Sequence, residues 1–120
     1  MKEVIAIIRP GKDRETKKAL GKLGCFACST LRVYGRGKQR GLKYVTSSSH
    51  NLQIPGAIVM KYLPKKLISI TVVDQEVKSV VNTIIQINQT GKYGDGKVFV
   101  LNTEDVFRIR TGEKGEAALR

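Results

Sequence analysis

The chain has 120 residues, which is the length of one domain. Only 6% of them are aromatic, so a core must be built mainly from Val, Ile and Leu. The formal charge of +12 favours an anionic partner, which is nucleic acid, a phosphorylated ligand, an acidic protein or a membrane surface. No run of about 18 apolar residues predicts a membrane span, and no signal-peptide pattern begins the chain, so we expect a cytoplasmic protein without membrane insertion.

The first part of the chain predicts a strand, a helix and a second strand. The apolar run 4–8 is typical of a buried strand, and Pro10 follows it. Asp13 is expected to cap a helix that Gly24 ends. Residues 29–34 then form a second extended segment.

Cys25 and Cys28 form one C-x-x-C pair. A structural zinc site takes about four ligands, and the chain has a single histidine, His50. The pair is either a redox couple or, as we interpret it, two reduced thiols near the core of a cytoplasmic protein.

Residues 36–64 predict a long loop. They contain basic residues, glycines, a serine triplet at 47–49 and Pro55-Gly56, and only 57–62 resembles a strand. A loop of this length within a compact domain is usually functional or disordered, so we interpret it as a mobile arm.

The second half repeats the pattern of strand, helix and strand. Alternating apolar residues predict a strand at 67–73, and Asp74 is expected to cap a helix with apolar residues at helical spacing from 77 to 85. Residues 98–101 predict another strand, and 106–110 a last short extended piece.

This order of elements predicts a single α+β domain over residues 1–120. The plan is the ferredoxin-like split βαβ sandwich, an antiparallel sheet with two helices on one face. Because the strands carry Val and Ile on both sides, the uncovered face would be an exposed apolar surface. We therefore predict an oligomer in which sheets meet.

A glycine-rich run at 90–97, TGKYGDGK, separates the second helix from the strand that follows. The spacing differs from that of a Walker A loop, and the run follows a helix rather than opening one, unlike a dinucleotide-binding fingerprint. A helix cap followed by a tight turn would need only two glycines, so the remaining residues favour a ligand site.

Two further elements suit anions. The segment 35–41 combines glycines with Arg and Lys after a strand, and is either a phosphate-binding loop or a basic turn. In a strand, Arg108 and Arg110 would point the same way, either as a clamp for an oligophosphate or as a solvated edge.

The residues do not suggest an enzyme. His50 lies in the predicted arm without a nucleophile beside it, and Asp95 is the one carboxylate within a glycine cluster. A single carboxylate does not make an acid–base pair, so we assign no catalytic residue.

Several blocks make the chain resemble the PII (P-II) family of nitrogen-status regulators from end to end. They are IAIIRP at 5–10, GRGKQRG at 35–41, LPK at 63–65, TGKYGDGKVFV at 90–100 and RIRTGE at 108–113. The segments 34–41, 61–66 and 82–90 are most similar to the nitrogen-fixation subgroup of archaea and anaerobic bacteria.

The resemblance implies a homotrimer with ATP or ADP bound in clefts between subunits. Residues 36–63 would be the T-loop, which docks on the regulated protein. The nucleotide-binding residues implied are Ile7, Ser29, Gly35, Gly37, Lys38, Gln39, Thr71, Gly94, Asp95, Gly96, Lys97, Arg108 and Arg110.

The resemblance also implies that 2-oxoglutarate binds beside Mg-ATP, with magnesium held partly by Gln39. The 2-oxoglutarate-binding residues implied are Gln39, Arg40, Gly41 and Lys65. In the nitrogen-fixation subgroup the implied target is dinitrogenase, inhibited by a complex of two PII paralogues. An ammonium channel is the alternative target. A nucleic-acid-binding module, suggested by the charge, is the alternative outside the family, although aromatic platforms for bases are scarce.

The predicted loop departs from the family pattern. It is several residues longer than in ordinary PII proteins, and no tyrosine lies near its tip around 51–58, since Tyr44 and Tyr62 are near its two bases. The resemblance to the many bacterial members that are controlled by uridylylation therefore does not extend to a tyrosine at the loop tip, and the sequence leaves open whether a loop residue is modified.

Overall fold

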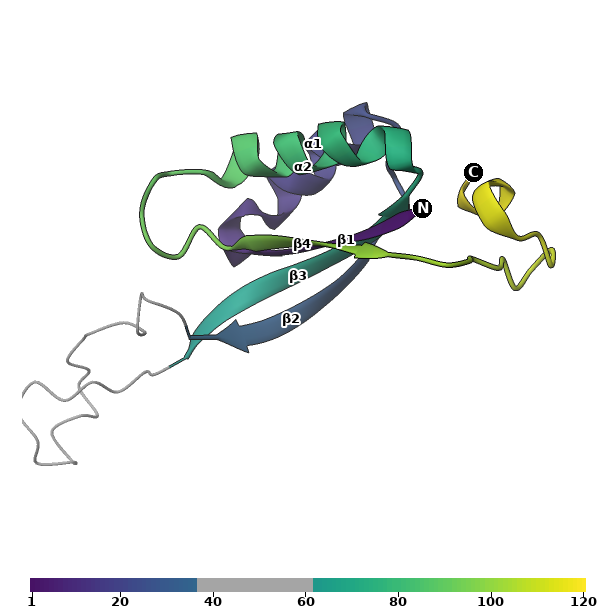
Figure 1. Cartoon of the computed structure of the whole chain (residues 1–120). Coiled ribbons are helices and arrows are strands. Elements are labelled where there is room, and N and C mark those ends of the chain that lie inside the picture. Colours follow the sequence, from purple (N-terminus) through teal and green to yellow (C-terminus); the bar gives the residue numbers. More distant parts are fainter. Residues whose placement is uncertain (37–61) are drawn as a thin grey trace, which may run out of the picture.

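The structure, a computed structural model, describes residues 1–36 and 62–120 (Figure 1). In these ranges the chain forms strands, two longer helices and short 3-10 turns. They are β1 (Lys2–Ile8), η1 (Pro10–Lys12), α1 (Asp13–Lys22), β2 (Ser29–Gly35), β3 (Leu63–Val72), α2 (Asp74–Asn88), β4 (Lys97–Asn102) and η3 (Gly115–Leu119).

The four strands form one antiparallel sheet in the order β2-β3-β1-β4. Both longer helices lie on the same face of this sheet, as Figure 1 shows. The predicted ferredoxin-like split βαβ arrangement is therefore confirmed. Since β1 and β3 are the central strands, their shared end is the natural place to build a site from several segments.

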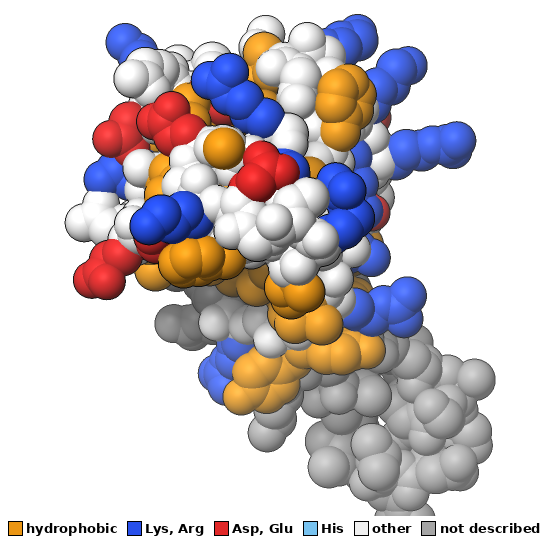
Figure 2. All heavy atoms as spheres, turned by 90° about the vertical axis from the view of Figure 1, so that its right-hand side faces the viewer, with side chains coloured by type: hydrophobic (Ala, Val, Ile, Leu, Met, Phe, Trp, Pro, Cys, Tyr) orange, Lys and Arg blue, Asp and Glu red, His pale blue; other side chains and the backbone are white. Residues whose placement is uncertain are grey.

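The sheet face away from the helices carries apolar side chains that the described residues leave exposed. Leu31 of β2 is 60% exposed, and Phe99 and Leu101 of β4 are 46% and 44% exposed. Figure 2 shows apolar side chains gathered below the helical layer. Polar side chains interrupt this face. Among them, the Ser69 hydroxyl donates a hydrogen bond to the Glu3 carboxylate at 2.8 Å. The predicted meeting of sheets in an oligomer stays a prediction.

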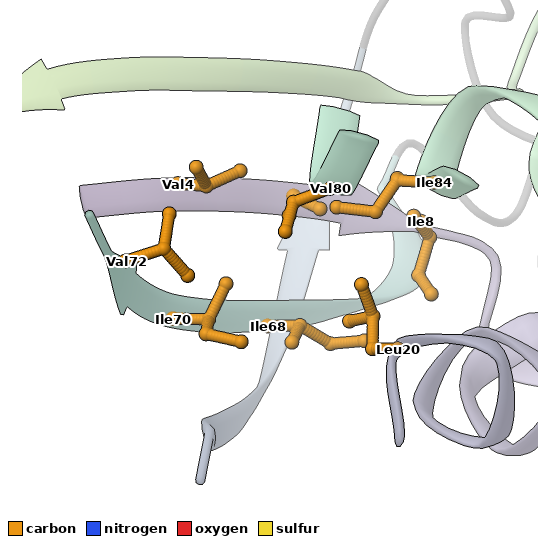
Figure 3. Close-up of a cluster of buried hydrophobic side chains, with 9 residues drawn as sticks. Val4, Ile8, Leu20, Ile68, Ile70, Val72, Val80 and Ile84 are labelled. Carbon is orange, nitrogen blue, oxygen red and sulfur yellow. The ribbon is translucent and has the colours of Figure 1, made fainter. Parts of the chain in front are cut away.

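The hydrophobic core lies between the helices and the other face of the sheet (Figure 3). Alternate residues of β1 and β3 point into it, as the period of two in a strand requires. Each side chain of the cluster is at most 4% exposed. The members are Val4, Ala6, Ile8, Leu20, Ile68, Ile70, Val72, Val80 and Ile84.

Helix α1 begins one residue earlier than predicted. Lys12 occupies the N-cap position without a side-chain cap, and Asp13 is the first helical residue. The Asp13 carboxylate instead pairs with Lys17 at 3.1 Å, one turn along the helix. The prediction that Gly24 ends the helix is confirmed, because Gly24 directly follows the C-cap residue Leu23 and has a φ of 85°.

Helix α2 shows the same shift. Val73 is its N-cap residue and Asp74 the first helical residue, so the predicted capping role of Asp74 was wrong. The Asp74 carboxylate lies 3.0 Å from the N-terminal ammonium of Met1. The hydrogen bond that this ammonium donates lowers the pKa of Asp74, and the positive charge of the ammonium lowers it further. A carboxylate in the first turn still favours the helix through the helix dipole.

Strand β3 begins at Leu63, four residues before the predicted start at Leu67. Pro64 and the lysines after it suggested a loop. Pro64 is tolerated because β1 pairs with β3 only as far as Lys66, so Pro64 has a strand neighbour on one side alone. Of the predicted extended piece 57–62, residues 57–61 lie outside the described residues.

The prediction of a strand at 106–110 was wrong. The structure has an isolated bridge between Phe107 and Lys114, and a turn between them. The Arg108 side chain pairs with Glu113 at 2.9 Å, while Arg110 is exposed in the turn. The argument that both arginines share one strand face therefore does not hold within one chain.

A buried polar contact joins α1 to the C-terminal end of α2. The Asn88 side-chain amide donates to the Thr16 hydroxyl at 3.0 Å and to the Ile84 carbonyl at 2.8 Å. The Thr16 hydroxyl in turn donates to the Lys12 carbonyl at 2.7 Å. Asn88 is the last residue of α2, so this contact fixes the point from which the glycine-rich segment starts.

We expect Asn88→Ala to lower the free energy of unfolding by about 2 kcal/mol, because it removes hydrogen bonds inside the protein and leaves a gap. Gln86→Ala, at an exposed position of α2, should change the stability by less than about 0.5 kcal/mol. Urea unfolding of both variants measures the difference. Equal effects would contradict a structural role for the Asn88–Thr16 contact.

Candidate anion-binding site

Residues 90–97, which we call the glycine loop, connect α2 to β4 and are folded around the carboxylate of Asp95. Asp95 accepts hydrogen bonds from the backbone N–H groups of Thr90 at 2.7 Å and Gly91 at 2.9 Å, and from the Thr90 hydroxyl at 2.5 Å. Arg9 donates to it at 2.6 Å. The hydrogen bonds from Thr90 and Arg9 hold the pKa of Asp95 well below its usual range. The loop is therefore organised by one ionised carboxylate.

Two cations attach the glycine loop to the central strands. Arg9, directly after β1, donates a second hydrogen bond to the Tyr93 carbonyl at 3.0 Å. Lys65 of β3 donates to the Gly94 carbonyl at 2.8 Å, and the residue is 9% exposed. Burial, and then the nearby Arg9 charge, lower the pKa of Lys65, while Asp95 acts in the opposite sense.

Glycine is required where the loop passes β1. Gly94 and Gly96 have φ values of 101° and 105°, which side chains of L-residues rarely adopt. A Cβ atom on Gly96 would lie 1.8 Å from the carbonyl oxygen of Ile7. The loop can therefore approach the end of β1 closely enough to form the wall of a cavity.

A cavity of about 580 Å³ lies between the glycine loop and the ends of the strands. This volume is within the usual range for small-molecule sites. Its wall contains four cationic side chains and one carboxylate, which the loop and Arg9 already bind. The lining residues are Ile7, Gly35, Arg36, Lys65, Lys92, Tyr93, Gly94, Asp95, Gly96, Lys97 and Phe99. The excess of positive charge suits an anionic ligand.

A comparison with family models identifies this arrangement. Residues 1–113 match the model described as "Nitrogen regulatory protein P-II". The chain belongs to the P-II family. The predicted family is therefore confirmed, and its members are regulatory signalling proteins rather than enzymes.

Curated relatives match the P-II chain over its whole length. The "Nitrogen fixation nifHD1 region GlnB-like protein 2" of Methanosarcina barkeri is 47% identical over 127 residues and covers 100% of both chains. The "Nitrogen fixation nifHD region GlnB-like protein 2" of Methanothermobacter marburgensis is 48% identical, covering 99% of this chain and 100% of the relative. The "Nitrogen regulatory protein P-II" of Klebsiella oxytoca is 42% identical, with the same two coverages.

Within this P-II chain the structure brings together seven of the residues predicted to bind ligands. They all line the cavity beside the glycine loop, and they are Ile7, Gly35, Lys65, Gly94, Asp95, Gly96 and Lys97. Their contacts with a ligand stay predictions. Sequence reasoning missed Arg36, Lys92, Tyr93 and Phe99 as lining residues, and Arg9 as the partner of Asp95. Lys92 and Tyr93 lie inside the glycine loop, so their positions were a usable signal.

Two other predicted residues lie toward the opposite end of the sheet. Thr71 pairs with Glu3, whereas Ile7 pairs with Leu67. Four residues of strand separate the two positions along β3, which is about 13 Å. Ser29, at the start of β2, pairs with Ser69. One chain therefore does not bring Ser29 or Thr71 to the cavity.

Arg108 and Arg110 also lie outside the cavity of their own chain. They belong to the segment that continues from the end of β4 opposite to the glycine loop (Figure 1). Arg108 additionally donates hydrogen bonds to the carbonyls of Ala117 and Ala118 at 3.3 and 3.2 Å. The predicted clamp would thus need a second chain.

The remaining predicted ligand residues, Gly37, Lys38, Gln39, Arg40 and Gly41, lie outside the described residues. In the parts that the structure describes, no group of three or more His, Cys, Asp or Glu residues is placed to hold a metal ion. No helix at 1–36 or 62–120 is long and apolar enough to cross a membrane. Both cysteines are free thiols, and burial raises the pKa of Cys25.

Proposed function

We propose that this P-II protein binds ATP or ADP together with 2-oxoglutarate and uses the bound state to control nitrogen fixation. The observation that carries the proposal is the cavity between the glycine loop and the ends of β1, β2 and β3. It combines glycine backbone with Lys97, Lys65 and Arg36 around one space. Such a combination suits a phosphorylated ligand and a dicarboxylate side by side.

The residues divide between the two ligands by position. Lys97 and the backbone of Gly94 and Gly96 would bind phosphate oxygens, because they form the glycine loop. Lys65 would bind a carboxylate of 2-oxoglutarate in exchange for its hydrogen bond to the Gly94 carbonyl. Magnesium would be held by the phosphates and Gln39, and it would neutralise charge between the ligands.

A homotrimer would complete the site. Ser29, Thr71, Arg108 and Arg110 do not reach the cavity of their own chain, so a neighbouring chain would have to supply them. Exposed apolar residues are consistent with such contacts, since Ile109, between the two arginines, is fully exposed. The exposed face of the sheet would be covered in the same assembly.

The proposed target is dinitrogenase, bound together with a second P-II-like chain. The names of the archaeal relatives place those proteins in nitrogen-fixation regions and number them as the second GlnB-like protein. This protein would act without catalysis, by binding or releasing the target according to its ligands.

Titration calorimetry with Mg-ATP, with and without 2-oxoglutarate, tests the ligand part of the proposal. We expect each ligand to strengthen binding of the other. Lys97→Ala should weaken ATP binding on the order of tenfold or more, because it removes a charge-assisted phosphate contact. Lys78→Ala, which removes an exposed cation from α2, is the matched control and should bind normally. No binding of wild type at millimolar ATP would refute this part.

Co-purification with dinitrogenase tests the target. Complex formation should depend on a second P-II-like chain and should be reversed by Mg-ATP with 2-oxoglutarate. Retention by an ammonium channel instead, in the same ligand conditions, would show that the alternative target is correct.

A further inference from the structure

The side chain of Arg108 is held by the segment that follows it in the same chain. Its guanidinium pairs with the Glu113 carboxylate at 2.9 Å. It also donates hydrogen bonds to the backbone carbonyls of Ala117 at 3.3 Å and Ala118 at 3.2 Å, and to the backbone oxygen of Arg120. The N–H groups that could bind an anion therefore already have partners within the chain.

The backbone folds the same segment, residues 113–120, back on Arg108. We call this segment the tail. The Arg108 N–H donates to the Glu113 carbonyl at 2.8 Å, and the Gly115 N–H donates to the Val106 carbonyl at 2.9 Å. The contacts between the tail and Arg108 join residues at most 12 positions apart in the chain. The tail can therefore open without unfolding the sheet.

Arg110 is not held in this way. It is exposed, and no ion pair in the described parts of the chain includes it. The Arg108 side chain, in contrast, is 24% exposed. The two arginines that are proposed to bind phosphate together thus differ in availability, because the tail covers one of them.

The carboxylate that holds Arg108 is a group that a phosphate can replace. A guanidinium binds carboxylate and phosphate oxygens with the same paired N–H groups, so Glu113 and a phosphate would compete for it. The Glu113 side chain is 43% exposed. Ion pairs of such exposure contribute little stability in water, so a phosphate that carries more charge can displace the carboxylate.

The end of the tail lies beside another residue of the proposed composite site. A cavity of about 200 Å³ lies between the tail and the sheet, and its wall includes Thr71, Leu119 and Arg120. This is the end of the molecule opposite to the glycine loop (Figure 1). Thr71 and Arg108 are both proposed to complete the cavity of a neighbouring subunit. The tail therefore lies at the surface that would meet this cavity.

We propose that the tail inhibits the nucleotide site of the neighbouring subunit by holding Arg108, and that a nucleotide phosphate releases the tail by taking the place of Glu113. The inference rests on the proposed function, because it takes Arg108 as a phosphate ligand in a homotrimer. The affinity for ATP is then reduced by the fraction of subunits whose tail is closed. Binding at one subunit changes the surface of the next, since it opens that subunit's tail.

Titration calorimetry with Mg-ATP tests the competition. Glu113→Gln should bind on the order of threefold more tightly than wild type, because it removes the competing charge. Glu116→Gln removes the same charge from another exposed position of the tail and should bind as wild type does. Equal affinities of the two variants would overturn the proposal. Weaker binding by Glu113→Gln would also overturn it, since Glu113 would then position Arg108 for the phosphate.

A double variant shows whether the effect acts through Arg108. Arg108→Ala should weaken Mg-ATP binding, and the addition of Glu113→Gln to it should bring no further change. A gain in affinity that persists without Arg108 would reject the competition. Circular dichroism confirms that each variant is folded.

Limited digestion with trypsin, followed by mass spectrometry, measures the opening of the tail. Lys114 forms a backbone bridge with Phe107, so cleavage after Lys114 requires an open tail. Mg-ATP should accelerate this cleavage in wild type, whereas Arg108→Ala should be cleaved rapidly with or without ATP. Binding of Mg-ATP without faster cleavage would reject the inhibitory tail and leave the proposed function standing. Absence of Mg-ATP binding by wild type would refute both.

Discussion

Replacing Gly96 by alanine should strongly destabilise the protein. The added Cβ atom would lie 1.8 Å from the Ile7 carbonyl oxygen, in a backbone conformation with φ at 105°. Neither atom can move alone, because Ile7 belongs to a central strand. Steric overlap and backbone strain together should lower the free energy of unfolding by about 3 kcal/mol or more. Urea unfolding measures this loss.

Gly91→Ala is the matched control for Gly96→Ala. Gly91 lies in the same loop and has a φ of 84°, but nothing lies within 4 Å of its Cβ position. It therefore isolates the cost of backbone strain, which we expect to be about 1 kcal/mol. If both variants lost the same stability, the close approach to Ile7 would not be what requires glycine.

The second large effect is expected from Asp95→Asn. Removing a negative charge beside an anion site should, by simple Coulomb attraction, strengthen ATP binding. We expect the opposite, a loss on the order of tenfold, because an Asn amide cannot accept all the hydrogen bonds from Thr90, Gly91 and Arg9. The glycine loop would then lose the order on which ligand contacts depend. Titration calorimetry with Mg-ATP measures the change.

Glu104→Gln removes the same charge at an exposed position and should bind ATP as wild type does, or slightly more tightly. Tighter binding by Asp95→Asn would show that Asp95 acts through charge and not through the loop. A proton should have the same effect as the substitution. Since the folded protein lowers the pKa of Asp95, its stabilising contribution is fully present above the ordinary carboxyl pKa of 3.8 and is lost as the pH falls below it.

The sequence predicted the elements that depend on local patterns. A nearly continuous apolar run located β1, alternation of apolar residues located most of β3, and Gly24 correctly marked the end of α1. Both helices start one residue earlier than predicted, because a carboxylate stabilises the first helical turn as well as the N-cap position. The carboxylates of Asp13 and Asp74 pair with Lys17 and with the N-terminal ammonium of Met1 instead of capping their helices. The strand start at Leu63 was missed because Pro64 is tolerated only where a neighbouring strand ends.

The site was predictable in its segments and not in its internal contacts. The glycines and Lys97 indicated the loop directly. The contact between Arg9 and Asp95 joins residues 86 apart, and no periodicity or spacing signals such a pair. As a result, the resemblance placed Asp95 with the phosphate contacts, whereas its carboxylate binds the loop itself. We therefore expect it to position the glycine loop.

The contact of the N-terminal ammonium with Asp74 has a practical consequence for the choice of affinity tag. Only 9% of the Met1 side chain is exposed, and its amine neutralises a carboxylate in the first turn of α2. A peptide fused before Met1 converts this amine into an amide and removes the charge, and acetylation does the same. A purification tag therefore belongs at the other terminus. There it leaves the ion pair in the first turn of α2, the helix that leads into the glycine loop, unchanged.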